Sequence, residues 1–306
     1  MSAPATRAGF VAIVGAPNAG KSTLVNALVG AKVSIVSPKV QTTRMRVIGI
    51  AMTDLADGTR AQVVLVDTPG IFRVARRRLE RAMVAAAWQG AEDADAVALV
   101  VDAERGVGEE TRAIMKKLGS SRARRHLVLN KIDLVAREKL LALTAELNAL
   151  LSFDRTFMVS ALERDGIADV LTALAEGLPA GPFLYPEDQA ADLPMRLLAA
   201  EVTREQVFLQ LHQELPYEAA VETDKWEERA DGSVRIEQTI HVQREGQRAI
   251  VLGKGGTRIK QIGARARQEL GRMLERPVHL FLHVKVSARW ADDPAHYRAI
   301  GLDYEP

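Results

Sequence analysis

The feature that most constrains the fold is a glycine-rich segment that directly follows an apolar run near the start of the chain. The run extends from Phe10 to Val14, and the segment Gly15 to Ser22 reads GAPNAGKS. A strand, a glycine-rich loop and a helix in this order favour a phosphate-binding loop. Backbone N–H groups at the glycines and the helix N-terminus attract phosphate, and Lys21 would reach the β and γ phosphates. The alternative is an ordinary glycine turn between a strand and a helix.

Apolar runs recur through the first 178 residues and are separated by segments with helical periodicity. They are QVVLV (62–66), AVALVV (96–101), HLVLN (126–130) and FMVS (157–160). Near-continuous apolar strands that alternate with helices are typical of a mostly parallel sheet with both faces covered. The sequence therefore predicts an α/β domain of the P-loop type over residues 1–178.

Short polar motifs stand where three of these runs end. Asp67 begins DTPG, so its carboxylate would hold Mg²⁺ through water, while the Gly70 amide would contact the γ phosphate. Asp133 ends NKID and would accept two hydrogen bonds from guanine N1 and N2, a donor pair that adenine lacks. Ser160 and Ala161 would add a backbone amide for the guanine oxygen. Each motif alone could be a strand-ending turn, but their order predicts a GTP site.

A threonine pair lies between the phosphate loop and DTPG, in the segment QTTR. We expect Thr43 to complete the Mg²⁺ shell when the γ phosphate is present, with Thr42 as the alternative. Loss of this ligand on hydrolysis would release the segment and create a switch. Two ordinary threonines at the entry to a strand are the other interpretation.

A proline-rich stretch over 179–195 predicts the domain boundary, since Pro179, Pro182, Pro186 and Pro194 suit neither helix nor strand interiors. The pattern of residues 196–306 differs from that of the first part. It predicts, in order, a helix, two strands around Asp231-Gly232, a short helix, a long helix and a last strand with strict alternation from Val278 to Val286. This order describes a smaller α+β domain.

The segment Gly253 to Gly256, GKGG, joins the two helical segments of this second domain. Glycines at both ends would let a sugar-phosphate backbone approach, and Lys254 adds a mobile cation. From Arg244 to Arg289, eleven Lys and Arg stand against three Glu, which is an electrostatic footprint for phosphate. A glycine-rich helix connection and a solvated helix face are the competing interpretations.

Composition excludes several function classes. The chain has no cysteine, which rules out disulfides and thiolate chemistry, and its net charge of +2 does not identify a partner. No apolar stretch approaches the roughly 18 to 20 residues that span a bilayer, and MSAPATRAGF lacks the apolar core of a signal peptide. We expect an intracellular protein.

With GAPNAGKS, QTTR, DTPG, NKID, SAL and VLGKGG in this order, the chain resembles the Era-like family of bacterial ribosome-assembly GTPases, in the translation-factor class. The resemblance implies a protein that binds GTP and GDP and hydrolyses GTP slowly. It also implies a C-terminal type II KH domain that grips the single-stranded 3′ end of small-subunit (16S) ribosomal RNA during maturation of the small ribosomal subunit (30S). We expect a cytoplasmic monomer, and the family implies peripheral association with the inner face of the cell membrane.

One position departs from the Ras-like pattern. Ile71 follows Gly70 where many GTPases carry a glutamine that orients the attacking water. In related GTPases an asparagine in the phosphate loop, here Asn18, helps bind a K⁺ ion, although Asn18 could instead stabilise the loop. Hydrolysis is therefore expected to be slow and to be stimulated by K⁺ or by the ribosomal partner. The arginines after DTPG fit a partner-facing charge run better than an internal arginine finger; they are Arg73, Arg76, Arg77 and Arg78.

The candidate residues fall into four groups. Those expected to act in catalysis are Lys21, Thr43 and Gly70. Those expected to bind nucleotide are Gly15, Asn18, Gly20, Lys21, Ser22, Thr23, Asp67, Gly70, Asn130, Lys131, Asp133, Ser160 and Ala161, with Ser22, Thr43 and Asp67 also serving Mg²⁺. Those expected to bind RNA are Gly253, Lys254, Gly255, Gly256, Arg258, Lys260 and Arg265. Two rival interpretations remain: another RNA-acting GTPase, such as a tRNA-modification or 50S-assembly factor, and an RNA-binding module with a vestigial nucleotide site.

Overall fold

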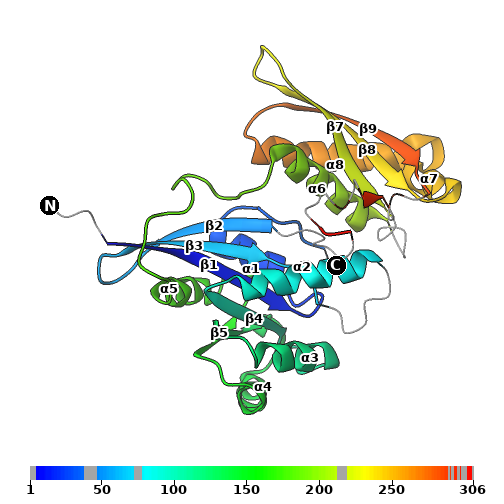
Figure 1. Cartoon of the computed structure of the whole chain (residues 1–306). Coiled ribbons are helices and arrows are strands. Elements are labelled where there is room, and N and C mark those ends of the chain that lie inside the picture. The colour runs from blue at the N-terminus through cyan, green and yellow to red at the C-terminus, as the bar shows by residue number, and fades with distance from the viewer. Residues whose placement is uncertain are drawn as a thin grey trace. The chain divides into compact units, whose positions relative to one another are not determined.

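A computed structural model describes residues 5–37, 47–71, 78–211 and 219–288, together with 290, 293, 294, 297 and 302–304. The chain divides into two compact units. The first unit comprises Met1–Ser34, Thr43–Asp192 and Gly301–Pro306, and the second comprises Ile35–Thr42 and Leu193–Ile300. Figure 1 shows the elements of both units, which are described separately below.

The first unit contains a six-stranded sheet in the order β2-β3-β1-β4-β5-β6. Its strands are β1 (Thr6–Gly15), β2 (Val47–Asp54), β3 (Arg60–Asp67), β4 (Ala96–Asp102), β5 (Arg124–Asn130) and β6 (Arg155–Val159). All neighbouring pairs are parallel except β2 with β3. The predicted mostly parallel sheet is therefore confirmed, and its carboxyl ends gather the polar motifs at one edge.

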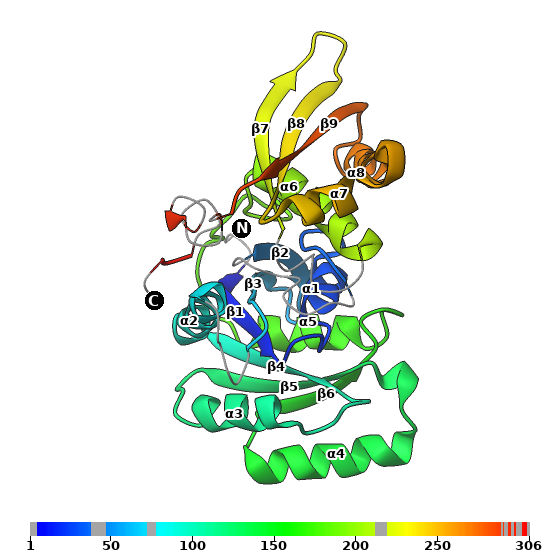
Figure 2. The ribbon, with the colours of Figure 1, turned by 90° about the vertical axis from the view of Figure 1, so that its right-hand side faces the viewer.

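Helices cover both faces of this sheet. They are α1 (Lys21–Val29), α2 (Arg78–Glu92), α3 (Glu109–Leu118), α4 (Arg137–Leu150) and α5 (Ile167–Glu176). Val11 and Ile13 of β1 join a core with α1 and α5, whereas Ala12 and Val14 join a second core with α2, α3 and α4. Successive strand residues point to opposite faces, so an apolar run with no polar interruption is what a strand covered on both sides requires. Figure 2 shows helices on the two sides of the sheet.

Strand β2 was not predicted from the sequence. It forms an antiparallel hairpin with β3 through a turn at Asp57-Gly58, where Gly58 has a φ of 81°. β2 lies at the edge of the sheet, and its sequence VIGIAMTD contains a glycine and little strict alternation. The Asp-Gly pair before the run at 62–66 was the available signal for a hairpin.

The proline-rich stretch is hydrogen-bonded to the first unit over much of its length. Ile50 N–H donates to Ala190 O at 2.8 Å, and Asp192 N–H donates to Ile48 O at 3.1 Å, so this stretch runs antiparallel beside the β2 edge. The fully buried Gln62 of β3 accepts from the N–H groups of Leu184 and Tyr185 and donates to Tyr185 O at 2.8 Å. The segment from Pro179 to Asp192 is thus hydrogen-bonded to β2 and β3, and we call it the strap.

The second unit is a three-stranded sheet in the order β7-β8-β9, packed against helices. Its elements are α6 (Met195–Gln210), β7 (Ala220–Glu228), β8 (Val234–Val242), α7 (Glu245–Leu252), α8 (Thr257–Met273) and β9 (Val278–Val286). The central strand β8 pairs antiparallel with β7 and parallel with β9. Alternate β8 residues are buried against α6, α7 and α8; they are Val234, Ile236, Ile240 and Val242. The predicted element order and the α+β class of this unit are confirmed.

Candidate functional site

The phosphate loop joins β1 to α1, as the sequence predicted, and Lys21 is the first residue of the helix. Its ammonium donates to Gly15 O at 3.1 Å and to Ala16 O at 3.0 Å, so the side chain folds back over the loop. Lys21 is only 6% exposed. A buried ammonium beside the N-terminus of a helix provides a concentrated positive field for an anion.

Burial changes the protonation of this lysine. Loss of hydration lowers the pKa of Lys21 from its ordinary 10.5 to about 8, although the nearby Asp67 carboxylate acts in the opposite direction. A phosphate group in the loop would add negative charge beside the ammonium and raise this pKa again. Nucleotide binding should therefore be coupled to the protonation of Lys21.

Ser22 and Asp67 meet at the expected magnesium position. Ser22 Oγ donates to Asp67 Oδ2 at 2.7 Å, and Asp67 is fully buried. Among the described residues no cluster of three or more His, Cys, Asp or Glu could hold a metal. One hydroxyl and one carboxylate nevertheless fit Mg²⁺, which takes hard oxygen ligands and completes its shell with waters and substrate phosphates.

A second hydroxyl at this position was missed from the sequence. Ser34 Oγ also donates to Asp67 Oδ2 at 2.7 Å, and Ser34 is 3% exposed. The Ser34 backbone is in turn held by Asn26 of α1, whose Oδ1 accepts the Ser34 N–H at 2.9 Å. A serine four residues after the C-terminal cap of α1, with no recognisable motif around it, offered no signal of this contact.

The DTPG segment passes directly beside the phosphate loop. A Cβ placed on Gly70 would lie 3.1 Å from Pro17 Cα, and Ile71 N–H donates to Gly15 O at 3.3 Å. Thr68 Oγ1 fixes the end of β3 by donating to Ile13 O at 2.7 Å. The Ile71 side chain is 5% exposed and packs in the core with Ala12 and Val14 of β1. Its burial agrees with the expectation that this position does not orient water.

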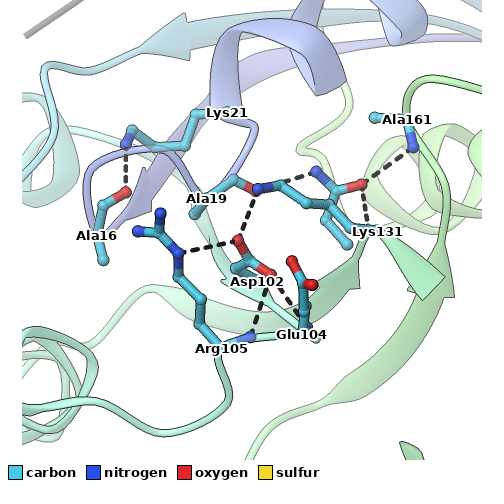
Figure 3. A network of polar contacts seen from close by, with 9 residues as sticks. Ala16, Ala19, Lys21, Asp102, Glu104, Arg105, Lys131 and Ala161 are labelled. Atoms are coloured by element: carbon cyan, nitrogen blue, oxygen red, sulfur yellow. Dashed lines mark hydrogen bonds and ion pairs between the residues drawn. The ribbon is translucent and has the colours of Figure 1, made fainter. Parts of the chain in front are cut away.

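Asn130 connects three parts of the base site, at Ala19, Lys131 and Ala161, which are labelled in Figure 3. Its Nδ2 donates to Ala19 O of the phosphate loop at 3.0 Å, and its Oδ1 accepts N–H groups from Lys131 at 2.9 Å and Ala161 at 3.0 Å. Gly20 has a φ of 90°, and a Cβ there would lie 2.2 Å from Asn130 Nδ2. Only glycine at this position leaves room for the asparagine. The structure therefore brings together the phosphate loop, NKID and SAL.

Asp133 is exposed and helps to line a cavity of about 620 Å³, together with Ser160, Met158 and Leu140. Asp133 makes no side-chain hydrogen bond with the residues that the structure describes, so its two oxygens are available to a ligand. Ser160 Oγ accepts the Glu163 N–H at 3.2 Å. The Ala161 amide, predicted to reach the guanine oxygen, is engaged by Asn130 here, and its contact with the base stays a prediction.

Five candidates lie outside the described residues: Thr42, Thr43, Arg73, Arg76 and Arg77. Asn18 lies in the loop with a left-handed φ of 64°, a conformation that asparagine tolerates, which is in keeping with the loop-stabilising alternative. Thr23 lies in the first turn of α1. Arg78 begins α2, and its guanidinium lies 4.1 Å from the centroid of the Tyr304 ring.

In the second unit the GKGG loop lies between α7 and α8. Gly253, Gly255 and Gly256 have φ values of 70°, 61° and 75°, a left-handed conformation that favours glycine at all three positions. A Cβ on Gly255 or Gly256 would meet nothing within 4 Å, so this backbone is open to an approaching ligand. The loop leads into the N-terminus of α8, a helix of 17 residues.

Four of the predicted RNA-binding residues are cations in or after this loop. Within the described residues Lys254, Arg258, Lys260 and Arg265 form no ion pair. Arg248, Arg272 and Arg276, in contrast, pair with Glu245, Glu269 and Glu228. Cations without acidic partners around a glycine loop provide a surface for a phosphate backbone. Of the apolar residues that precede the loop, Val251 is a fully buried core residue, while Ile250 is 46% exposed.

One further polar residue of the base site was missed. Asp102 ends β4, directly beside Asn130 of β5 in the parallel register, and its Oδ2 lies 2.6 Å from Lys131 Nζ. The signal was present in the sequence, because Asp102 closes the apolar run 96–101 just as Asp67 and Asn130 close theirs. A lone aspartate before a loop resembles an ordinary turn residue, so its role was not apparent.

Two family models match the chain. Residues 10–131 match a model described as a 50S ribosome-binding GTPase, and residues 214–291 match a KH domain model. The first match covers the phosphate loop, DTPG and the start of NKID, and the second covers the GKGG loop. No helix among the described residues has the length and apolar character needed to cross a membrane.

Comparison with individual proteins gives matches over nearly the full length. The chain is 60% identical over 300 residues to GTPase Era of Bradyrhizobium diazoefficiens, covering 98% of this chain and 96% of that protein. It is 59% identical over 299 residues to GTPase Era of Sinorhizobium medicae, covering 98% and 94%. A single-substitution variant of Aquifex aeolicus Era bound to GDP and AlF4⁻ superposes with a TM-score of 0.91 at 38% identity, covering 98% of this chain and all of that one. Era in complex with MgGDPNP and nucleotides 1506–1542 of 16S ribosomal RNA superposes with a TM-score of 0.90 at 37% identity and the same coverage.

Proposed function

The chain belongs to the Era family of GTPases, and from this premise we propose that it is a nucleotide-dependent switch that binds the 3′ end of small-subunit ribosomal RNA. It binds GTP and GDP with Mg²⁺ in the first unit, hydrolyses GTP slowly, and binds single-stranded RNA through the KH domain. The observation that carries the nucleotide half is the hydrogen-bond network of Asn130, which joins the phosphate loop to NKID and SAL.

Each part of the nucleotide has a proposed partner. The N-terminus of α1 and Lys21 hold the β and γ phosphates, since both supply positive charge in a buried setting. Ser22 and Asp67 hold Mg²⁺, with Thr43 as a further ligand in the GTP state. Asp133 selects guanine through the N1 and N2 donors, and the stem of Lys131 lines the base. The remaining proposed contacts come from backbone N–H groups between Gly15 and Thr23, and from Ser160 and Ala161.

Hydrolysis depends on positioning and electrostatics. When bound, Mg²⁺ supplies charge neutralisation at the β and γ phosphates. Lys21 neutralises further charge on the same oxygens, and the Gly70 amide contacts the γ phosphate. Ile71 is buried and offers no hydrogen bond to the attacking water, so the unstimulated reaction is slow. Asn18 would help to hold a K⁺ ion, which would supply the missing charge stabilisation, and contact with the ribosome would be the other source of it.

The RNA half of the proposal is supported by the GKGG loop and the cations around it. The open backbone at Gly255 and Gly256, the N-terminus of α8 and the exposed side chain of Lys254 all favour a sugar-phosphate chain. Arg258, Lys260 and Arg265 extend this positive surface along α8. The Era structure that contains 16S ribosomal RNA supports the 3′ end as the target.

The proposed setting is the small ribosomal subunit during its maturation. The protein acts as a cytoplasmic monomer, and its association with the inner face of the cell membrane is peripheral, as the family resemblance implies. The model described as a 50S ribosome-binding GTPase covers residues 10–131 alone and does not include the KH domain. The near full-length match to the Era structure with 16S ribosomal RNA therefore favours the small subunit over the large one.

The proposal is tested by measuring GTP turnover and RNA affinity with the same protein. Turnover is compared in K⁺ and in Na⁺ at equal ionic strength, and we expect K⁺ to accelerate it. The affinity for an oligonucleotide of the 16S 3′ end is compared with GDPNP and with GDP, and we expect tighter binding with GDPNP. No turnover in either salt, together with unchanged RNA affinity, would support an RNA-binding module with a vestigial nucleotide site.

A further inference from the structure

The side chain of Lys131 is held at its tip by an acid outside the known motifs. Lys131 follows β5 with a left-handed φ of 67°, a conformation unusual for a lysine. Its ammonium lies 2.6 Å from Oδ2 of Asp102, the last residue of β4 (Figure 3). The Asp102 side chain is 5% exposed and that of Lys131 30%, so the ion pair is partly shielded from water.

Asp102 is itself fixed by the loop that follows it. Its Oδ1 accepts the N–H groups of Glu104 at 3.0 Å and Arg105 at 3.3 Å, while its backbone oxygen accepts the Gly106 N–H at 2.9 Å. The Arg105 guanidinium lies 3.7 Å from Oδ2. Oδ1 therefore anchors the loop, while Oδ2 pairs closely with Lys131 and at longer range with Arg105.

The aliphatic stem of Lys131 lies beside the phosphate loop. A Cβ on Gly20 would lie 4.0 Å from Lys131 Cε, close to the point where Asn130 reaches Ala19. The stem thus lies beside the phosphate loop, and Asp102 anchors its far end. Without this anchor, four rotatable bonds would let the ammonium move into solvent.

We propose that Asp102 is a positioning residue of the guanine site, which holds Lys131 in its base-lining conformation and slows nucleotide release. The inference rests on the proposed function, because it concerns the same site. The inference predicts a change in nucleotide affinity opposite in direction to the one expected from charge alone. Removing a negative charge near bound phosphates should by itself strengthen binding of an anion, whereas loss of the Asp102 anchor weakens it because Lys131 must be ordered again on each binding event.

The test is the release rate of mant-GDP from the full chain, measured after mixing with excess unlabelled GDP. Asp102→Asn removes the charge but keeps an oxygen that can accept the Glu104 and Arg105 N–H groups. We expect it to accelerate release by about five- to tenfold, the effect of ordering one long side chain. Glu104→Gln removes the same charge two residues away without touching Lys131, and it should change the rate less than about twofold.

A second variant distinguishes loss of the Lys131 anchor from a general effect of Asp102→Asn on folding. Lys131→Met keeps the stem and removes the ammonium, so Asp102→Asn added to Lys131→Met should cause no further acceleration. Equal release from Asp102→Asn and the wild type, or additive effects in the double variant, would overturn the inference. A wild-type protein that fails to bind mant-GDP would instead overturn the proposed function, so the two failures are distinguishable.

Discussion

The Ala161 N–H donates a hydrogen bond of 3.0 Å to Oδ1 of Asn130, although the two residues are 31 positions apart. The contact fastens the loop after β6 to the end of β5. Since the same asparagine also donates to Ala19 O, a single side chain sets the position of three loops that meet at the carboxyl edge of the sheet. The hydrogen bonds of Asn130 therefore set the relative positions of the loops that form the proposed base site.

Replacing Asp133 by asparagine should move the preference of the site from guanosine to xanthosine nucleotides. Asparagine presents one acceptor and one donor, which no longer match the N1 and N2 donors of guanine but suit the base with an oxygen at position 2. We expect GDP affinity to fall by at least about a hundredfold, since buried polar groups lose their partners. Competition of GDP and XDP against a fluorescent nucleotide measures the change; unaltered GDP affinity would remove Asp133 from base recognition.

Nucleotide affinity should fall as the pH rises, because Lys21 loses its proton. The pKa of Lys21 is about 8 without phosphate, because burial opposes the charge, and bound phosphate raises it. Below pH 8 the lysine is protonated in both states and affinity is constant. Above pH 8 binding must take up a proton, so GDP affinity should fall about tenfold between pH 7 and pH 9. Calorimetry in buffers of different ionisation heat detects this proton uptake.

Lys21→Met serves as the control for that experiment, because it cannot titrate. The variant should bind GDP more weakly at every pH and show a flat profile between pH 7 and pH 9. A wild-type profile as flat as that of the variant would contradict the assigned role of the ammonium.

Gln62→Leu should destabilise the first unit. The substitution leaves the N–H groups of Leu184 and Tyr185 without their acceptor and frees the strap from β3. We expect the free energy of unfolding to fall by about 2–3 kcal/mol, the cost of stranding partly buried donors. Urea unfolding measures it, with Gln189→Ala as the control, since that side chain donates to Ala191 O within the strap itself. Equal stability of the two variants would refute the anchoring role.

Aspartates at Lys254 and Gly255 should abolish binding of single-stranded RNA and spare GTP hydrolysis. They place two negative charges where the phosphate backbone is expected. Lys225→Asp with Gly232→Asp is a matched control, because it changes the same residue types at exposed positions of β7 and of the β7–β8 turn. Filter binding to the 3′-end oligonucleotide compares the two double variants. RNA affinity that survives in the first variant would exclude GKGG as the clamp.

The sequence predicted the fold where local pattern and tertiary environment agree. The runs at 10–14, 62–66, 96–101 and 126–130 are uninterrupted because their strands are covered on both faces, and all four lie in the sheet. β2 was missed because an antiparallel edge strand has fewer buried neighbours to impose a pattern. The stretch 179–195 was predicted as the domain boundary from its proline content, and that content gave no signal of the hydrogen bonds that its other residues make to β2 and β3.

In the site, too, the residues that belong to recognisable motifs were predicted, and those that depend on tertiary contacts were not. Lys21, Asp67 and Asn130 belong to motifs whose spacing carries chemical meaning, and the structure places them at one edge of the sheet. Ser34 and Asp102 act through partners that are 33 and 29 residues away; the position of Asp102 at the end of an apolar run marked it only as a turn residue, and Ser34 had no signal at all. Loop positions of this kind become recognisable only when the strand order is known.

The most direct test of the account is a calorimetric titration of nucleotide-free protein with GTP in the presence of Mg²⁺, alongside ATP under the same conditions. The account predicts saturable heat with one GTP bound per chain and no comparable signal with ATP, because adenine lacks the pair of donors that Asp133 accepts. Absence of heat with GTP, or equal binding of ATP, would contradict it.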